Sequence, residues 1–548
     1  MLHGCIRRRA ILFIFISALT GQPGFSQTID SAQAKKAWWR QAKFGLFIHW
    51  GLYAIPADGE WHMRNKKESI AVYSQNAAMF NPVKFNADEW AAIAQEAGVK
   101  YMVITTKHHD GFAMFHSKAS AYNIVDATPF KRDVIKELAG ATPKHDIRFG
   151  TYYSMMADWG HPGGGKGEPN WDSAQNGDLN TYFNTVAAPQ LRELMTNYGP
   201  LAELWLDTDG ARPPSPEQTA EIYKIIHLQP QLIVNTRVVK GDFNNAERHM
   251  PALTPLADWE YCDIISPGSW GYNKKAKAFP LPVLIRQLID VVSRGGNELL
   301  NVGPRADGTF PEDAVDRLKG MGAWLKINGD AVYGTTAGPF DYLPWGRSTI
   351  KENKLYLHVF DWPADGKLNV PMANKVSSAW LLSDKTKKQL KFKTSNGSLT
   401  LSLPSSAPDS IASVIVLDVK DPVAPVHSLA LDRPAEASVG EAKYAFDNNP
   451  DSGWENPNAA PAWIKVDLGT TNEMNTMRLS YTFGKIIKFS MEYWDKDHWQ
   501  TVFEDENLPI DRYVKTFSSI KAQLVRFNIK EASGQKNRIH SLELFDAN

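Results

Sequence analysis

Short apolar segments alternate with amphipathic segments between residues 40 and 330, and this alternation constrains the fold most. The apolar segments have the length and the β-branched and aromatic content of strands, and the amphipathic ones have the period of helices. Seven or eight such units, with no glycine-rich phosphate loop after the first strand, predict a (β/α)8-like barrel rather than an open doubly wound sheet. The expected strands are Phe44–Trp50, Tyr101–Thr106, Arg148–Ser154, Ala202–Asp207, Leu232–Thr236, Asp263–Ser266 and Glu298–Val302; the expected helices are Ala87–Glu96, Arg132–Leu138, Thr181–Asn197, Pro216–His227 and Pro282–Arg294.

The pattern changes after residue 335, where alternating strands follow one another without helices. Such a pattern is typical of antiparallel β-sandwiches. We therefore expect a multidomain chain, with the barrel over residues 27–334, a small antiparallel β-sandwich over 335–420 and a C-terminal β-sandwich over 421–548. The stretch from Val419 to Pro425 is the expected linker between the last two.

The N-terminus has the composition of an export signal. Arg7, Arg8 and Arg9 precede an apolar run from Ala10 to Ala18, and small residues follow up to Ser26. This pattern predicts a signal peptide over residues 1–26 and a secreted or periplasmic protein without membrane insertion after its removal. An N-terminal membrane anchor is the alternative.

Composition excludes some classes of partner. Lys and Arg together number 60, as do Asp and Glu, so the chain has no net basic charge to attract nucleic acid. The 18 Trp residues suit stacking on sugars, although large cores use Trp as well.

In a barrel of this type, reactive side chains gather at the C-terminal ends of the strands. The expected strand ends carry His49, His108 with His109, the pair Tyr152-Tyr153, Trp205 with Asp207, and Arg237. A carboxylate that ends a strand as apolar as the one before Asp207 is costly unless it has partners or a function. Hydrolysis of a glycosidic bond needs two carboxyl groups. Asp207 is one candidate, and both Glu247 and Glu260 qualify as the second, since the residues alone do not separate them.

Seven collinear motifs between residues 35 and 335 together resemble family 29 of the glycoside hydrolases, the α-L-fucosidases. They are Phe44-Gly-Leu-Phe-Ile-His-Trp-Gly51, Lys107-His-His-Asp-Gly-Phe112, Tyr152-Tyr-Ser154, Leu204-Trp-Leu-Asp207, Val234-Asn-Thr-Arg237, Trp270-Gly-Tyr272 and Gly295-Gly-Asn-Glu-Leu-Leu-Asn-Val-Gly-Pro304. The resemblance implies retaining removal of terminal α-L-fucosyl residues from glycans or glycoproteins through a covalent fucosyl-enzyme, with no cofactor for catalysis.

The resemblance also implies roles for single residues. Asp207 matches the nucleophile, and Glu247, ten residues beyond Arg237, matches the acid/base, with Glu260 as the alternative. Relatives often have Thr-Pro-Glu where this chain has Asn-Ala-Glu, and usually place Gly directly after the nucleophile, where this chain has Thr208-Asp209-Gly210. Asp209 could affect Asp207, contact a substrate hydroxyl or cap the next segment. The implied sugar contacts are His49, Glu60, Trp61, His108, His109, Tyr153, Trp205, Arg237 and Trp270.

The C-terminal strings Ala445-Phe-Asp-Asn-Asn-Pro-Asp-Ser-Gly-Trp454 and Trp463-Ile-Lys-Val-Asp-Leu-Gly469 resemble a discoidin-like carbohydrate-binding domain. Oxygen ligands around Asp447 and Asp451 could hold a structural calcium ion, or could form an ordinary turn.

Two other functions remain open at this stage. The first is a barrel metallohydrolase that uses His49, His108, His109 and Asp207 as zinc ligands, although adjacent histidines on a strand face opposite ways. The second is a degenerate glycosidase that only binds glycans.

Overall fold

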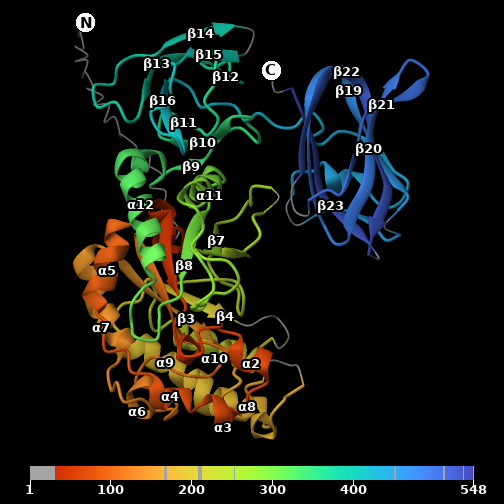
Figure 1. The fold of residues 1–548 in the computed structure, drawn as a ribbon. Helices are drawn as coiled ribbons and strands as arrows, with labels where there is room; N and C mark the ends of the chain where they lie inside the picture. The colour runs from red at the N-terminus through yellow and green to blue at the C-terminus, as the bar shows by residue number, and fades with distance from the viewer. Residues whose placement is uncertain are drawn as a thin grey trace, which may run out of the picture.

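The computed structural model describes residues 31–165, 169–207, 213–251, 253–395, 398–449, 452–458, 460–509, 513–534 and 536–546. The expected signal peptide, Asp209 and Asp451 therefore lie outside the described residues. Figure 1 shows three units: a helix-covered barrel, a small β-sandwich above it and a larger β-sandwich beside both. Among the described residues, no helix has the length and apolar character to cross a membrane.

A curled sheet of eight parallel strands forms the barrel. The strand order is β5-β4-β3-β2-β1-β8-β7-β6, and a parallel bridge between Asn235 and Phe243 joins the two outer strands, so that the sheet closes. The strands are β1 Phe44–Ile48, β2 Tyr101–Lys107, β3 Arg148–Ser154, β4 Glu203–Asp207, β5 Ile233–Val234, β6 Asn244–Glu247, β7 Trp259–Ile264 and β8 Asn297–Val302. The predicted barrel is confirmed.

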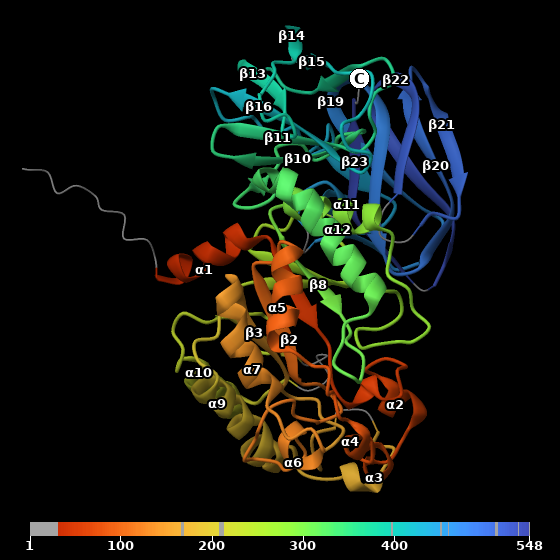
Figure 2. The same ribbon diagram turned by 60° about the vertical axis from the view of Figure 1, so that its left-hand side comes forward.

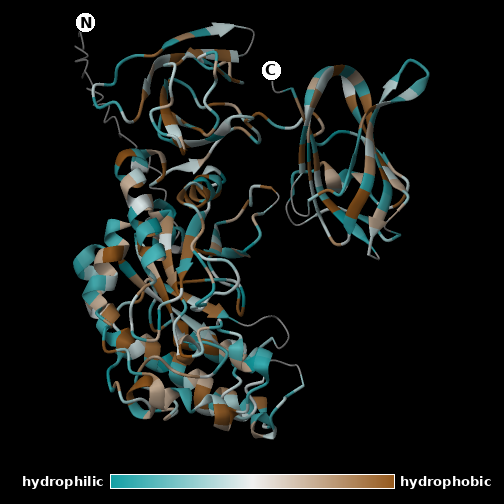
Figure 3. Ribbon diagram, in the orientation of Figure 1, coloured by the Kyte–Doolittle hydropathy of each residue, from teal (hydrophilic) through white to brown (hydrophobic). Residues whose placement is uncertain are grey.

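The barrel has two apolar layers, because its strands are buried on both faces. One layer fills the inside and includes Phe47, Tyr101, Tyr152, Trp205 and Cys262. The other lies between the strands and the surrounding helices. Figure 3 shows the hydrophobic colour concentrated on the strands, with hydrophilic residues on the outer helices. The direction in which each strand residue points therefore decides whether it lies in the barrel interior or packs against the surrounding helices.

Strand β6 is the element that the apolar pattern missed. Its sequence is Asn-Asn-Ala-Glu, and it pairs with β7 in parallel, Glu247 lying opposite Cys262. Strand β7 also starts at Trp259, four residues before the expected start at Asp263. Glu247 and Glu260 therefore lie on strands, in a stretch where none of the expected strands falls.

The helices follow local sequence signals. Asn86 and Asp133 cap the α5 and α7 helices, and Ser215 forms a capping box with Gln218 at the start of α10. The expected helix Thr181–Asn197 is divided by a π-helical segment, Phe183–Ala187. The α-helices are α1 Ser31–Ala42, α2 His62–Lys66, α3 Ile70–Tyr73, α4 Asn76–Met79, α5 Ala87–Glu96, α6 Ile124–Ala127, α7 Val134–Ala141, α8 Leu179–Tyr182, α9 Ala188–Asn197, α10 Pro216–Ile226, α11 Leu281–Ser293 and α12 Glu312–Asn328.

The small sandwich packs on α11 and α12, as Figures 1 and 2 show. Arg286 on α11 donates to the carbonyl oxygens of Phe360 and Ile411, and Trp324 on α12 donates to that of Ala412. Its five-stranded sheet contains β9 Thr336–Ala337, β10 Gly346–Lys351, β11 Lys354–Val359, β13 Val376–Leu381 and β16 Ser413–Val419; its three-stranded sheet contains β12 Lys367–Val370, β14 Lys391–Ser395 and β15 Ser398–Ser402.

The C-terminal β-sandwich has its own core around Trp454, Phe489 and Phe527. It is joined to the small sandwich by Arg478, which pairs with Glu543 and donates to the carbonyl oxygen of Asp341. Its strands are β17 Ala435–Ala437, β18 Trp454–Asn456, β19 Ala462–Thr482, β20 Lys485–Asp495, β21 His498–Glu506, β22 Tyr513–Ser533 and β23 Asn537–Phe545. The fold is thus the multidomain arrangement expected, while the residue boundaries between domains stay predictions.

Candidate active site

A pocket of about 150 Å³ lies at the C-terminal ends of the barrel strands. This volume is smaller than the roughly 300–1,000 Å³ of sites that hold drug-sized ligands, so the pocket suits a single small ring rather than a long chain. The pocket is lined by Phe47, His49, Trp61, His108, His109, Tyr152, Trp205, Asp207, Arg237, Glu247, Cys262 and Trp270. The structure therefore brings together the predicted site residues, with the exceptions of Glu60, Tyr153 and the alternative acid Glu260.

Asp207 is the last residue of β4 and is 8% exposed. Its Oδ2 accepts a hydrogen bond of 2.6 Å from the Tyr152 hydroxyl, and its Oδ1 lies 3.1 Å from Nε of Arg237. Nε2 of His109 lies 3.6 Å from Oδ2. These three partners hold the carboxylate in one orientation at the floor of the pocket.

One guanidinium group connects the two candidate catalytic carboxyl groups. Arg237 contacts Asp207 through Nε, and its Nη1 donates to Oε2 of Glu247. Although burial lowers the pKa of Arg237, Asp207 and Glu247 raise it above its usual value, so the guanidinium stays charged. Asp207 and Glu247 consequently face the same cavity within the reach of a single side chain, which is the arrangement that a two-carboxylate mechanism needs.

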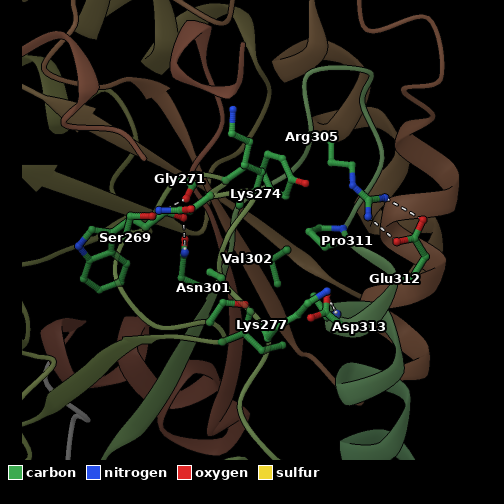
Figure 4. A pocket seen from close by; sticks show the side chains of 18 of the residues that line it. Ser269, Gly271, Lys274, Lys277, Asn301, Val302, Arg305, Pro311, Glu312 and Asp313 are labelled. Atoms are coloured by element: carbon green, nitrogen blue, oxygen red, sulfur yellow. Dashed lines mark hydrogen bonds and ion pairs between the residues drawn. The ribbon is translucent and has the colours of Figure 1, made fainter. Parts of the chain in front are cut away.

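His49 is held as a neutral hydrogen-bond acceptor. Asn301 donates its amide N–H to the carbonyl oxygen of Trp270 at 2.7 Å, so its Oδ1 accepts from Nδ1 of His49, also at 2.7 Å. Figure 4 shows Asn301 below the chain segment at Ser269 and Gly271. Burial lowers the pKa of His49 to about 3, and Nε2 is therefore unprotonated. An unprotonated nitrogen in a pocket can accept a hydrogen bond from a sugar hydroxyl.

His109 has its tautomer fixed in a similar way. The Ser154 hydroxyl donates to the carbonyl oxygen of Ala157, so it accepts from Nδ1 of His109 at 2.6 Å. His108 and His109 both reach the pocket, with ring centres 4.3 Å apart, because they follow the end of β2 rather than lie within it. The alternation argument against neighbouring histidines therefore does not apply to them.

Tyr153 is not at the pocket, and Tyr152 takes its place. On β3, Tyr152 pairs in register with Trp205 and points into the barrel, whereas Tyr153 pairs with Leu206 and points outward. The Tyr153 hydroxyl donates to Gln190 on α9 at 2.8 Å. Because the two tyrosines are adjacent and identical in type, the sequence does not show which one points into the barrel. Trp205 and Asp207 share one face of the next strand, and matching a tyrosine to that face could have identified Tyr152.

Glu60 supports the pocket from behind. It is 2% exposed, and its Oε2 accepts from the backbone N–H of Gly271 at 2.8 Å. Burial raises its pKa, while the amides of Gly271 and Trp270 act in the opposite direction. The structure therefore places Glu60 behind the Trp270 loop, the segment between β7 and α11 (residues 265–280), where it binds this loop and does not line the cavity.

Glu260 is fully buried inside the barrel, below the pocket. Its carboxyl group accepts hydrogen bonds from Tyr101 at 2.7 Å and from Nε1 of Trp205 at 3.3 Å. Burial raises its pKa to about 7. From this position it does not face the cavity that Asp207 and Glu247 share.

Comparisons with known proteins agree with this geometry. A family model described as Alpha-L-fucosidase matches residues 13–330 of the 548-residue chain. The chain belongs to the α-L-fucosidase family. A second model, described as F5/8 type C domain, matches residues 432–544, in the C-terminal sandwich.

Individual fucosidases extend the comparison. Human plasma α-L-fucosidase is 34% identical over 386 residues, which cover 63% of this chain and 80% of the relative. The α-L-fucosidase of Vibrio sp. strain EJY3 is 26% identical with a TM-score of 0.74, and the match covers 92% of this chain and 98% of that one. A family 29 α-L-fucosidase from Bacteroides thetaiotaomicron, solved as a trapped covalent intermediate with 2-fluoro-fucosyl fluoride, is 29% identical with a TM-score of 0.64 over 72% of this chain and 97% of its own.

Two tryptophans near the first strand, Trp50 and Trp61, have different surroundings in this α-L-fucosidase family member. Trp50 is 1% exposed and packs against Phe80, Phe85 and Trp90 in the core. Trp61 lines the pocket and lies against His109, with ring centres 5.6 Å apart. Trp50 is therefore a packing residue, and Trp61 is a wall of the cavity.

The described residues contain no group of three or more His, Cys, Asp or Glu side chains that could hold a metal ion. In the F5/8 type C domain, the Asp447 carboxylate accepts from the backbone N–H of Asn449 and from the Ser452 hydroxyl. These bonds are those of a local turn.

A second cavity, of about 320 Å³, lies on the other side of the Trp270 loop. Its walls carry Lys274, Lys277 and Arg305 on the one hand and Glu312, Asp313 and Asp316 on the other. Figure 4 shows Arg305 paired with Glu312 across its rim. The charges of these basic and acidic side chains balance.

Proposed function

We propose that the protein is a retaining exo-α-L-fucosidase in which Asp207 is the nucleophile and Glu247 the general acid/base. The observation that carries this proposal is the shared guanidinium, because Arg237 holds both carboxyl groups over one monosaccharide-sized cavity. Family membership and the covalent intermediate trapped in the Bacteroides relative support the same chemistry.

In the first step, an oxygen of Asp207 attacks the anomeric carbon of the fucosyl residue while Glu247 donates its proton to the glycosidic oxygen, which leaves as an alcohol. In the second step, Glu247 takes a proton from water, the water oxygen attacks the same carbon, and Asp207 is released. Two inversions give net retention. Tyr152 and Arg237 stabilise the charge that returns to Asp207 in the second step.

The imidazoles and the aromatic walls supply sugar recognition. His49 and His109 present Nε2 atoms to the cavity, since their Nδ1 atoms are bound to Asn301 and Ser154. Trp61 and Trp270 provide faces for the ring and for the 6-deoxy methyl group.

Rescue by azide tests the two carboxyl roles on aryl α-L-fucosides. In Asp207→Ala, azide replaces the nucleophile and a single inversion gives the β-fucosyl azide. In Glu247→Ala, azide attacks the covalent intermediate and gives the α-fucosyl azide. Proton NMR of the wild-type product is expected to show retained fucose. An inverted product would refute the mechanism, and a wild type that binds fucose without turnover would favour the glycan-binding alternative.

We also propose that the protein is exported and that the F5/8 type C domain holds it near fucosylated glycans. The basic and apolar pattern of residues 7–18 supports export, and relatives are named plasma and tissue fucosidases. N-terminal sequencing of the protein recovered outside the cytoplasm should begin near residue 27. Calcium near Asp447 stays a prediction, to be tested by calcium titration of the thermal unfolding midpoint.

A further inference from the structure

Strand β4 points three side chains into the barrel, one above another. Asp207 lies at the pocket, Trp205 lies below it, and Glu203 lies deepest, because alternate residues of a strand share a face. Glu203 and Glu260 are both fully buried, and Glu260 raises the pKa of Glu203. A pair of acids in the closed interior is costly, and catalysis at Asp207 and Glu247 does not use it.

The hydrogen bonds around Glu260 show what this acid pair does. Tyr101 and the indole N–H of Trp205 both donate to Glu260, so its carboxyl group is an acceptor on two sides. Burial and the neighbouring Glu260 raise the pKa of Glu203 well above its usual value, which leaves Glu203 as the proton-bearing member. Glu260 thereby fixes the indole from below.

Trp205 in turn carries the groups that orient the nucleophile. The guanidinium carbon of Arg237 lies over its ring, 5.0 Å from the centroid, and the ring of Tyr152 is stacked on it with centres 5.5 Å apart. Both Arg237 and Tyr152 contact Asp207.

We infer that Glu260 is a positioning residue that acts through Trp205 to hold Arg237 and Tyr152 against Asp207. The inference rests on the proposed function, because it takes Asp207 as the nucleophile and Glu247 as the acid/base. It gives the alternative acid candidate a different task, carried out from below the cavity without contact with the substrate.

The test compares Glu260→Leu and Glu260→Gln with Glu203→Gln. The leucine removes the acceptor for the indole N–H, whereas the glutamine keeps a carbonyl oxygen for it. Glu203→Gln changes the other acid of the buried pair and leaves the hydrogen bond between Trp205 and Glu260 in place. Each variant is checked for cooperative thermal unfolding. The substrates are a pair of aryl α-L-fucosides, one with a good and one with a poor leaving group, over a range of pH.

Glu260→Leu is expected to lower kcat about 10- to 100-fold to the same extent for both leaving groups, as expected for weakened electrostatic stabilisation rather than lost protonation. The acid limb of kcat/KM should move to higher pH, because an Arg237 that drifts from Asp207 makes the nucleophile easier to protonate. Glu260→Gln should recover most of the activity, and Glu203→Gln should leave the acid limb in place.

Several outcomes would overturn the inference. A loss in kcat/KM that is larger for the poor leaving group, together with azide rescue on the good leaving group that yields the α-fucosyl azide, would make Glu260 the acid/base itself. An unshifted acid limb in Glu260→Leu would reduce Glu260 to a packing residue. If Glu260→Leu does not fold, Trp205→Phe breaks the same hydrogen bond from the other partner, and it must move the acid limb of kcat/KM in the same direction.

Glu247→Gln tests the proposed function separately. If its loss in kcat/KM does not depend on the leaving group, the acid/base assignment fails, while the Glu260 result stands on its own.

Discussion

Tyr152 donates a 2.6 Å hydrogen bond to Oδ2 of Asp207, from the neighbouring strand of the barrel. A bond this short to a carboxylate stabilises its charged form. In the proposed mechanism, the charge on Asp207 disappears when the fucosyl-enzyme forms and returns when it breaks, so we expect the hydroxyl to act mainly on the breakdown of the intermediate.

Tyr152→Phe should therefore lower kcat by about 10- to 100-fold, the equivalent of about 1.4–2.7 kcal/mol in the barrier. The natural control is Tyr153→Phe on the same strand, which removes a hydroxyl that binds Gln190 outside the pocket. This control should keep its kcat within about twofold and lose roughly 1 kcal/mol of stability, because a buried acceptor loses its donor. Steady-state kinetics of both variants decides, and equal effects on kcat would contradict the assignment.

Asn301 couples His49 to the Trp270 loop, and two substitutions separate these contacts. Asn301→Asp can still accept from His49 but cannot donate to the Trp270 carbonyl oxygen, whereas Asn301→Leu loses both bonds. We expect kcat/KM to fall about tenfold in the leucine variant and less in the aspartate variant, since one hydrogen bond contributes about 1 kcal/mol. Inhibition constants for a fucose-configured iminosugar would measure the loss of recognition, and an unchanged constant in Asn301→Leu would exclude this role.

Glu298 gives a pH dependence of stability. It is fully buried on β8, its Oε1 accepts from Gln287, and burial raises its pKa from 4.5 to about 8. The folded chain then keeps a proton that the unfolded chain releases above pH 4.5. The contribution of Glu298 to the free energy of unfolding is therefore fully present below pH 4.5 and is lost as the pH rises to about 8.

Glu298→Gln removes that titration. Denaturant unfolding at pH 5 and pH 8 should show a smaller loss of stability in the variant than in the wild type, by an amount on the order of 2–4 kcal/mol. If the wild type and the variant lose the same free energy of unfolding between pH 5 and pH 8, Glu298 ionises normally in the folded chain.

Removal of metal ions separates the fucosidase mechanism from the zinc alternative. Because the proposed mechanism uses only side-chain carboxyl groups, exhaustive dialysis against a chelator should leave kcat unchanged. The thermal unfolding midpoint of the C-terminal domain is measured in the same sample, because the calcium ion predicted near Asp447 would be removed as well. A loss of turnover that zinc restores would reinstate the metallohydrolase hypothesis.

Most of the barrel was predictable because both faces of its strands are buried, and burial leaves long apolar segments such as Tyr101–Lys107 in the sequence. Strand β6 left no such trace, since three of its four residues are polar and none of them is fully buried. Its pairing with β7 comes from the closure of the barrel, which no local segment encodes.

The site divides in the same way. The linear sequence was enough to assign the family and to nominate Asp207, Arg237 and the two glutamates Glu247 and Glu260 as candidates, because their chemistry and spacing lie along the chain. Whether Tyr152 or Tyr153 faces the cavity, and whether Glu247 or Glu260 reaches it, depended on strand parity and on depth within the barrel. Those two properties exist only after distant strands pair, since register fixes which side chains point inward and how far below the opening each one lies.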